Sequence, residues 1–322
     1  MSNNKSANRL FLGTILVYIG FSLGFGMLSA WVPLLGKMPV YVNILLSQSL
    51  IFLPGFFYCR HKGIAIRDFI PYRRINFATA VLVVICTYLM YPLIIVLNAI
   101  SMLFTNSGTA AVMDMMQGQS FPLSMLFIAL LPACVEEFMF RGVLFHTYRR
   151  SRMLPAIFLS AFLFGCMHMN LNQFMYAFAL GVYLAFLVEA TGSILSSMLA
   201  HFTLNATSVA MSFLLSLLYQ AAGMGQASQL PQVQRGGYAS VMEGSELFMF
   251  LMGIVVWAAI AIGATCGALG VYYAICRING RWEYVRHMFR GGARERMVTA
   301  PLAVGIIIAF AFMGLSIWME MM

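Results

Sequence analysis

The chain has 322 residues, of which 61% are hydrophobic and only 9% are charged. Soluble domains carry about a quarter charged residues, so this composition argues against an ordinary soluble fold. The net charge of +9 does not indicate nucleic-acid binding, because the basic residues are spread over loops between apolar segments. We therefore expect a polytopic membrane protein with no nucleic-acid partner.

Nine apolar segments approach or exceed the ~20 residues that a helix needs to cross the hydrocarbon core. A backbone in lipid must satisfy its own hydrogen bonds, and the alternating ~10-residue segments of a membrane barrel are missing. The predicted fold is all-α: a polytopic transmembrane helical bundle with about 8–9 spans. In chain order the segments cover residues 10–32, 40–59, 77–104, 121–145, 154–170, 173–190, 193–219, 247–276 and 299–319.

Most of the 19 lysines and arginines fall in four groups outside the apolar segments. With the N-terminus inside, all four groups lie on the cytoplasmic side, as the positive-inside rule requires. The short loops favour a prokaryotic plasma membrane. We expect the basic loops to contact lipid headgroups, and Glu189, near the same side, to face headgroups and solvent. The groups are Lys5 and Arg9; Arg60, Lys62, Arg67, Arg73 and Arg74; Arg149, Arg150 and Arg152; and Arg277, Arg281, Arg286, Arg290, Arg294 and Arg296.

The fourth segment carries three ionisable residues within the stretch CVEEFMFRG, residues 134–142. Ionisable groups inside a membrane are costly and usually mark a functional site. Glu137 and Arg141 are four residues apart, so they share one helical face and can pair. Glu136 points about 100° away from its neighbour and is free to act as a general base. A structural charge pair at the helix end is the alternative interpretation, and this stretch alone does not decide between them.

Two further stretches, FGCMH at 164–168 and HFTLN at 201–205, add two histidines and an amide. His201 and Asn205 share a helical face and can donate two hydrogen bonds to one oxygen, as an oxyanion hole requires. With Glu136 and His168, His201 can instead bind Zn²⁺. The HExxH motif of soluble zinc proteases is absent and asparagine is a poor zinc ligand, so we expect no obligatory metal. Either histidine alone is also compatible with a packing role.

Taken in order, the three stretches resemble the signatures of a known family. EEFMFRG is similar to the EExxxR motif, FGCMH to FxxxH and HFTLN to HxxxN, and all three motifs are complete. These are signatures of the CAAX-protease and bacteriocin-processing family of intramembrane proteases, which is related to the Ras-converting endopeptidase. The resemblance covers about residues 121–215.

This resemblance implies a CAAX prenyl protease-like intramembrane endopeptidase that hydrolyses a peptide bond of a membrane-associated substrate. By the resemblance, Glu136 and His168 activate the attacking water. His201 and Asn205 then stabilise the tetrahedral oxyanion. The implied partners are the lipid bilayer and a membrane-anchored peptide or protein substrate.

The resemblance also implies supporting residues around this catalytic set. Glu137 and Arg141 position the site, and Phe164 packs beside it. The glutamate-dependent mechanism of the family requires no metal cofactor. Zn²⁺ stays open as an alternative, with Glu136, His168 and His201 as its ligands.

We divide the chain into three regions on this basis. Residues 1–120 form spans one to three with a basic cytoplasmic loop, residues 121–220 form the catalytic core of spans four to seven, and residues 221–322 form spans eight and nine. The last region begins with an external loop at 220–246. Two alternative functions use the same fold: a non-catalytic membrane partner or bacteriocin-immunity protein, and an ion-coupled transporter that uses the intramembrane carboxylates. No motif residue is missing, and no inverted repeat is visible, so both alternatives rank below the protease.

Overall fold

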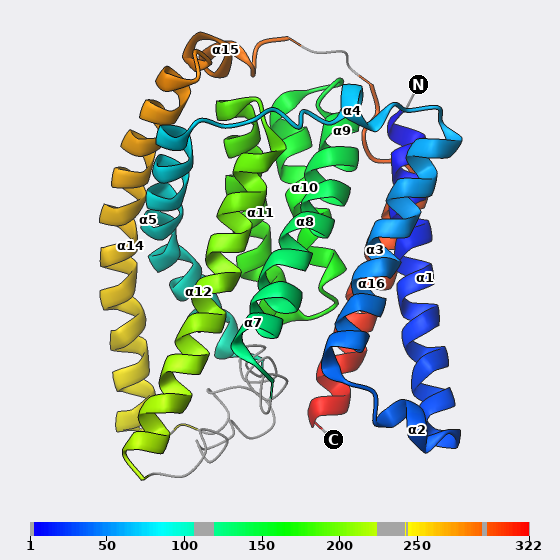
Figure 1. Ribbon diagram of the computed structural model, residues 1–322, viewed down its shortest axis with the longest axis vertical. Helices are drawn as coiled ribbons and strands as arrows, with labels where there is room; N and C mark the ends of the chain where they lie inside the picture. The colour runs from blue at the N-terminus through cyan, green and yellow to red at the C-terminus, as the bar shows by residue number, and fades with distance from the viewer. Residues whose placement is uncertain (1–2, 106–118, 224–241, 243, 292–294, 322) are drawn as a thin grey trace.

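The protein is a bundle of helices that run roughly parallel to one long axis (Figure 1). The computed structural model describes residues 3–105, 119–223, 242, 244–291 and 295–321. Within these residues every regular element is helical, which confirms the predicted all-α class. The helices are α1 Asn4–Trp31, α2 Pro33–Gly36, α3 Val40–His61, α4 Ile66–Phe69, α5 Phe77–Met102, α7 Phe121–Ser124, η1 Met125–Leu130, α8 Leu131–Glu137, η2 Phe138–Phe145, α9 His146–Tyr148, α10 Met153–Met167, α11 Leu171–Thr191, α12 Ile194–Ala221, α14 Ser245–Ile278, α15 Trp282–His287 and α16 Ala300–Met321.

Eight helical segments in the described part of the chain are long and apolar enough to cross a bilayer. The fourth is continuous over Phe121–Tyr148 and combines α7, η1, α8, η2 and α9. The protein is therefore an integral, multi-pass membrane protein. The segment expected to span at 154–170 is different, because it forms α10, a helix of 15 residues. At 1.5 Å per residue α10 is ~22 Å long, which is shorter than the ~30 Å hydrocarbon core.

The loops that carry the basic groups lie together at one end of the bundle. In Figure 1 the N-terminus, α4, α9 and α15 are at the top, whereas α2, α7 and the C-terminus are at the bottom. This common end is what the positive-inside rule requires of a cytoplasmic face. Which side of the membrane it faces stays a prediction. The loop expected at 220–246 falls mostly outside the described residues.

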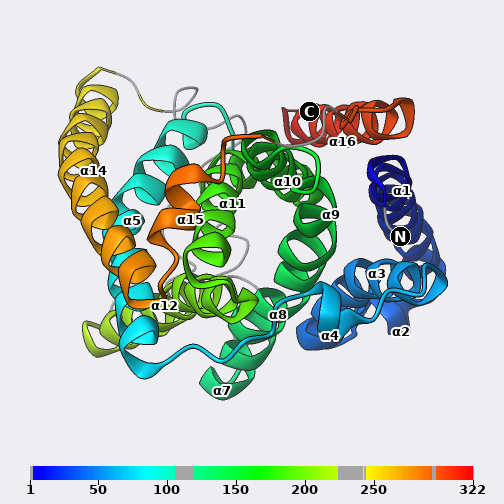
Figure 2. The ribbon, with the colours of Figure 1, turned by 90° about the horizontal axis from the view of Figure 1, so that it is seen from above.

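The bundle has two groups of helices, which Figure 2 shows from above. Helices α1, α3 and α16 pack together in one group, and α5, α10, α11, α12 and α14 form the larger one. The fourth span lies between them: α8 and η2 contact α3 on one side and α12 on the other. Side chains on the fourth span are therefore within reach of residues from both groups.

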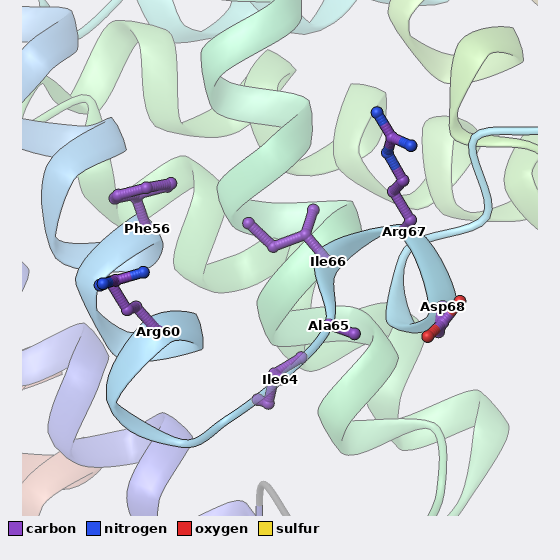
Figure 3. A pocket seen from close by; sticks show the side chains of 7 residues that line it. All are labelled: Phe56, Arg60, Ile64, Ala65, Ile66, Arg67 and Asp68. Atoms are coloured by element: carbon purple, nitrogen blue, oxygen red, sulfur yellow. The ribbon is translucent and has the colours of Figure 1, made fainter.

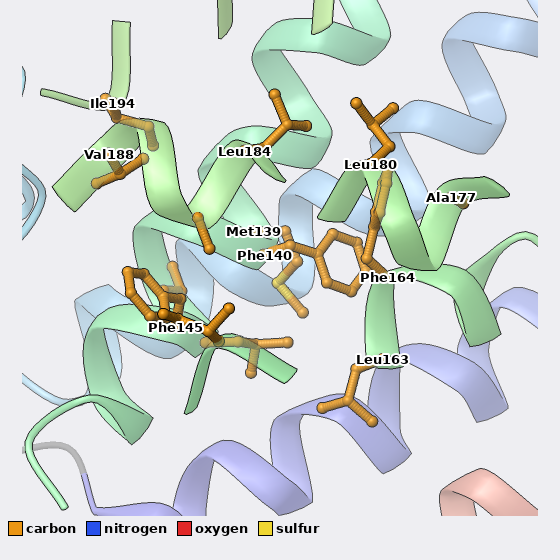
Figure 4. Packing of buried hydrophobic residues seen from close by; sticks show 14 of the residues in the cluster. Met139, Phe140, Phe145, Leu163, Phe164, Ala177, Leu180, Leu184, Val188 and Ile194 are labelled. Atoms are coloured by element: carbon orange, nitrogen blue, oxygen red, sulfur yellow. The ribbon is translucent and has the colours of Figure 1, made fainter. Parts of the chain in front are cut away.

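The most buried spans are the fourth one and α11. Within an apolar stretch of 18 residues in each span, 50% of the fourth span and 56% of α11 is buried, compared with 6–22% in the other six spans. Figure 4 shows Phe140 and Phe145 of η2, Phe164 of α10 and Leu184 of α11 within this core. Helices α10 and α11 approach so closely that a Cβ atom at Gly181 would lie 2.8 Å from an α10 backbone atom. Small residues allow such approach in membranes, so the core around the fourth span is tightly packed.

Candidate active site

Glu136 and Glu137 end α8, a seven-residue α-helical stretch between the π-helices η1 and η2. In a π-helix the backbone hydrogen bonds run from residue i to i+5, and such turns are rare and frequent at functional sites. Arg141 lies within η2. None of the three residues is more than 6% exposed. The charged residues therefore lie where the helical geometry changes.

Glu137 and Arg141 form an ion pair inside the bundle. Arg141 Nη1 donates to Glu137 Oε1 at 2.7 Å, and both side chains are fully buried. The same carboxylate oxygen lies 3.1 Å from His201 Nδ1. Because an ionised carboxylate only accepts hydrogen bonds, Nδ1 of His201 carries the proton in this contact. Glu137 thus connects the arginine of η2 to the histidine of α12.

Phe164 lies at the centre of this cluster. The guanidinium carbon of Arg141 is 4.3 Å from the centroid of the Phe164 ring. The same ring contacts His168 and His201, with centroid distances of 5.1 and 5.8 Å. A cation over an aromatic face is attracted by the ring, more strongly where water is excluded. Phe164 therefore supports the buried cation and fixes the positions of two histidines.

Glu136 has fewer partners than its neighbour. Its Oε1 accepts a hydrogen bond from Gln48 Nε2 of α3 at 3.0 Å. Its Oε2 is 3.8 Å from His201 Nε2 and has no hydrogen-bond partner among the described side chains. Leaving a buried carboxylate oxygen without a donor costs free energy. The site therefore keeps an anionic acceptor free at this position.

A cavity of about 120 Å³ lies beside Glu136. This volume exceeds the space that one water needs, and several polar side chains border it. Glu136 and His168 line the same cavity, so α8 and the end of α10 meet there. Its full lining is Tyr18, Ser47, Gln48, Ile51, Glu136, Phe140, Phe164, Met167, His168 and Gln173.

His168 stands at the tight turn that ends α10 and precedes α11. The next residue, Met169, has a φ of 51°, in the left-handed region that non-glycine residues rarely adopt. The Asn170 side chain then accepts a hydrogen bond from the Gln173 backbone at 3.1 Å and caps α11. A left-handed residue other than glycine costs about 1–2 kcal/mol. Such strain concentrates at functional sites, and here it holds His168 beside the cavity.

Asn205 lies one turn beyond His201 on α12 and is half-buried. It is not among the residues that line the cavity. Of the seven residues singled out from the sequence, six are linked to one another by contacts, and Asn205 follows one turn after His201. The six are Glu136, Glu137, Arg141, Phe164, His168 and His201.

Glu189 contradicts the expectation that it faces headgroups and solvent. Its side chain is fully buried, with Arg149 at 2.5 Å, Arg281 at 3.5 Å and the Tyr284 hydroxyl at 2.7 Å. Burial, and then the charge of Glu189, raise the pKa of Tyr284 to about 12, so this phenol stays a donor. The prediction was wrong because these partners come from other loops. Two arginines of the basic loops thus hold the end of α11 and do not serve only as lipid contacts.

A second pocket, of about 440 Å³, opens at the end of the bundle where α3 meets α4. Figure 3 shows Phe56, Arg60, Arg67 and Asp68 around it. It is larger than the cavity beside Glu136, but none of the motif residues lines it. The chemistry of the lining, and not the volume, therefore identifies the candidate site.

Comparison with known families agrees with this choice. Residues 118–207 match the family model described as type II CAAX prenyl endopeptidase Rce1-like. This segment is Rce1-like. It contains all seven residues of the candidate site and confirms the predicted resemblance to the CAAX-protease family. The match indicates a protease. No curated protein and no solved structure matches the chain.

Gln48 was not predicted as a site residue, and it lies outside the Rce1-like segment. Its signal was the one that singled out the glutamates, a polar side chain within an apolar span. A glutamine carries no charge and this one belongs to no motif, so nothing in the sequence indicated its partner.

The Rce1-like segment also holds the three zinc ligands considered from the sequence, Glu136, His168 and His201. Across the described ranges no three His, Cys, Asp or Glu side chains are grouped so that they could hold a metal ion. We therefore derive no chemical step through a metal at this site. Whether the protein binds Zn²⁺ stays a prediction for measurement.

Proposed function

We propose that the protein is an intramembrane endopeptidase that uses water to cleave a peptide bond of a membrane-associated substrate. The observation that carries this proposal is Glu136 Oε2, a buried acceptor to which no described side chain donates, beside a cavity that has room for water. The Rce1-like match of the surrounding segment supports the same reaction class. A membrane-anchored peptide or protein is the substrate class that fits a site within the spans.

In the first step a water in the cavity gives one proton to Glu136 Oε2. Its oxygen attacks the carbonyl carbon of the scissile bond and forms a tetrahedral intermediate. His168 lines the same cavity and orients this water through a ring nitrogen. The intermediate collapses when the carbon–nitrogen bond breaks, and Glu136 returns the proton to the leaving nitrogen. A positioned base of this kind contributes about 10²–10⁴-fold to the rate.

The oxyanion of the intermediate needs donors, and His201 is the nearest candidate. Its Nδ1 already donates to Glu137, so Nε2 can donate only when the imidazole is doubly protonated. The carboxylate oxygens of Glu137 and Glu136 lie 3.1 and 3.8 Å from the two ring nitrogens of His201. Asn205, one turn away on α12, supplies a second donor when substrate occupies the site. In this scheme Glu137 and Arg141 act by holding His201 in place.

The test begins with cells that express either the wild type or Glu136→Gln. A membrane peptide found only with the wild type identifies a product and therefore the substrate. The purified wild-type protein in liposomes should then cleave a synthetic peptide that spans this site, and Glu136→Gln should be slower by at least about 100-fold. Glu246→Gln, which changes an exposed glutamate in the first turn of α14, is the matched control. Wild-type cleavage rates in Glu136→Gln would refute the proposal.

A further inference from the structure

Gln48 is a buried amide in the membrane-spanning helix α3. It stands in the stretch VNILLSQSLIFL, residues 42–53, and is 8% exposed. It lies outside residues 118–207, so the family match assigns it no role. A methionine or leucine at this position would leave no polar atom to satisfy, whereas a buried amide must find hydrogen-bond partners. The choice of an amide therefore needs a physical reason.

The two ends of the Gln48 amide have different surroundings. Its Nε2 donates to Glu136 Oε1 at 3.0 Å. Because a carboxylate only accepts, the amide nitrogen and not its oxygen must face Glu136, which fixes the orientation of the group. The amide Oε1 is buried and has no partner in the part of the chain described. Helix α3 thus brings a fixed donor to Glu136 and a free acceptor next to it.

Gln48 and Glu136 both line the cavity of about 120 Å³. Since Gln48 occupies Oε1 of Glu136, Oε2 is the oxygen left to take a proton. A water that donates one hydrogen to Oε2 has a second hydrogen to place. Buried waters typically make about three hydrogen bonds, and the free Oε1 of Gln48 is an acceptor on the same cavity. The geometry therefore offers this water two acceptors at once.

We propose that Gln48 is a further residue of the catalytic machinery, which holds Glu136 through Nε2 and orients the attacking water through Oε1. This inference rests on the proposed function. The water gives one proton to Glu136 Oε2 and attacks through its oxygen lone pair, while its other hydrogen stays bonded to Gln48. Glu136 later returns its proton to the leaving nitrogen, and Gln48 ends the cycle unchanged.

A purely structural role for Gln48 makes a different prediction. Polar residues also join membrane helices, and here α3 would be joined to α8 through the bond to Glu136. Loss of such a hydrogen bond between helices lowers the thermal midpoint and leaves kcat per folded molecule unchanged. A catalytic role lowers kcat and leaves the fold intact.

The experiment compares Gln48→Met, Gln48→Asn and the control Ser49→Ala in liposomes with the synthetic substrate peptide. Met keeps the length of the side chain and removes both hydrogen bonds. We expect kcat per folded molecule to fall about 100-fold, with KM within about twofold. The shorter Gln48→Asn should lose at least about tenfold in kcat, and it decides the question if the Met variant does not fold. Ser49, whose hydroxyl bonds to the Leu45 carbonyl of its own helix, should be neutral.

A double variant separates positioning from general damage. In a Glu136→Gln background, Gln48→Met should lower the residual rate no further, because the base that it orients is gone. Additive losses, or a kcat of the single Gln48 variants within about twofold of the wild type, would overturn the assignment of Gln48. If Glu136→Gln is inactive while the Gln48 variants match the wild type, only this inference fails. If Glu136→Gln itself retains the wild-type rate, the proposed function fails as well.

Discussion

Glu136 and Glu137 are adjacent, yet changing each to glutamine should affect stability in opposite ways. Glu137→Gln removes the charge that faces a fully buried Arg141, whose Nε and Nη2 already lack partners among the described residues. Removing one member of a buried ion pair costs about 3–5 kcal/mol. The glutamine oxygen still accepts from Arg141 Nη1, so we expect the lower end of this range, about 3 kcal/mol.

Glu136→Gln changes a carboxylate whose Oε2 has no donor in the described structure. The amide keeps one oxygen for the bond from Gln48, so the free energy of unfolding should stay the same or rise by up to about 1 kcal/mol. Titration with SDS in mixed micelles, followed by tryptophan fluorescence, measures both values. Equal midpoints for the two variants would refute the assignment of Glu137 to structure and Glu136 to chemistry.

Three further predictions concern the surroundings of the site. Glu189→Gln should lower the free energy of unfolding by about 2 kcal/mol. This loss is smaller than for a fully buried ion pair, because the side chains of Arg149 and Arg281 are 31% and 25% exposed and can reach water. Glu283→Gln, which changes a side chain that is 73% exposed, is the control, and its free energy of unfolding should stay within about 0.5 kcal/mol of the wild type in the same titration. Equal losses in the two variants would contradict the role of the Glu189 contacts. Gly181→Ala should lower the free energy of unfolding by about 1–3 kcal/mol, because its Cβ would meet Ala161 at 2.8 Å. Gly270→Ala has open space around its Cβ, so this control should be neutral or stabilising in thermal melts. Exhaustive treatment with a chelator should leave the cleavage rate within about twofold, since the proposed mechanism activates the water through Glu136 and His168, and no metal-binding group of three His, Cys, Asp or Glu side chains is found among the described residues. A loss that added Zn²⁺ restores would show that a metal is required.

The sequence was sufficient to predict the membrane-spanning fold, because hydropathy over ~20 residues reports directly on burial in lipid. The segment expected at 154–170 forms the 15-residue helix α10, which ends at Met167, three residues before the predicted end. The cause is the turn at His168 and Met169. Nothing local predicts a left-handed methionine, and only packing around the turn enforces it.

The candidate site was partly predictable for a related reason. The spacing of Glu137 and Arg141 indicated their contact, because four residues along a helix are a local relation. The partners of Glu189 and Gln48 are not local: Tyr284 lies 95 residues after Glu189, and Glu136 lies 88 residues after Gln48. Pairings of this range follow from how the helices pack, which one sequence without aligned relatives does not specify.

The π-helices on either side of Glu136 and Glu137 constrain the length of the fourth span as well as its residues. A wide turn holds one residue more than an α-helical turn, so losing a single residue from Met125–Leu130 or Phe138–Phe145 would allow an ordinary helix to form. The span would still cross the membrane, and all three motifs could still be read in the sequence. Each residue gained or lost in an α-helical turn, however, rotates one side of the helix against the other by about 100°. A one-residue insertion or deletion in the α-helical turns of this span would therefore turn Glu136 away from its cavity, although all three motifs could still be recognised.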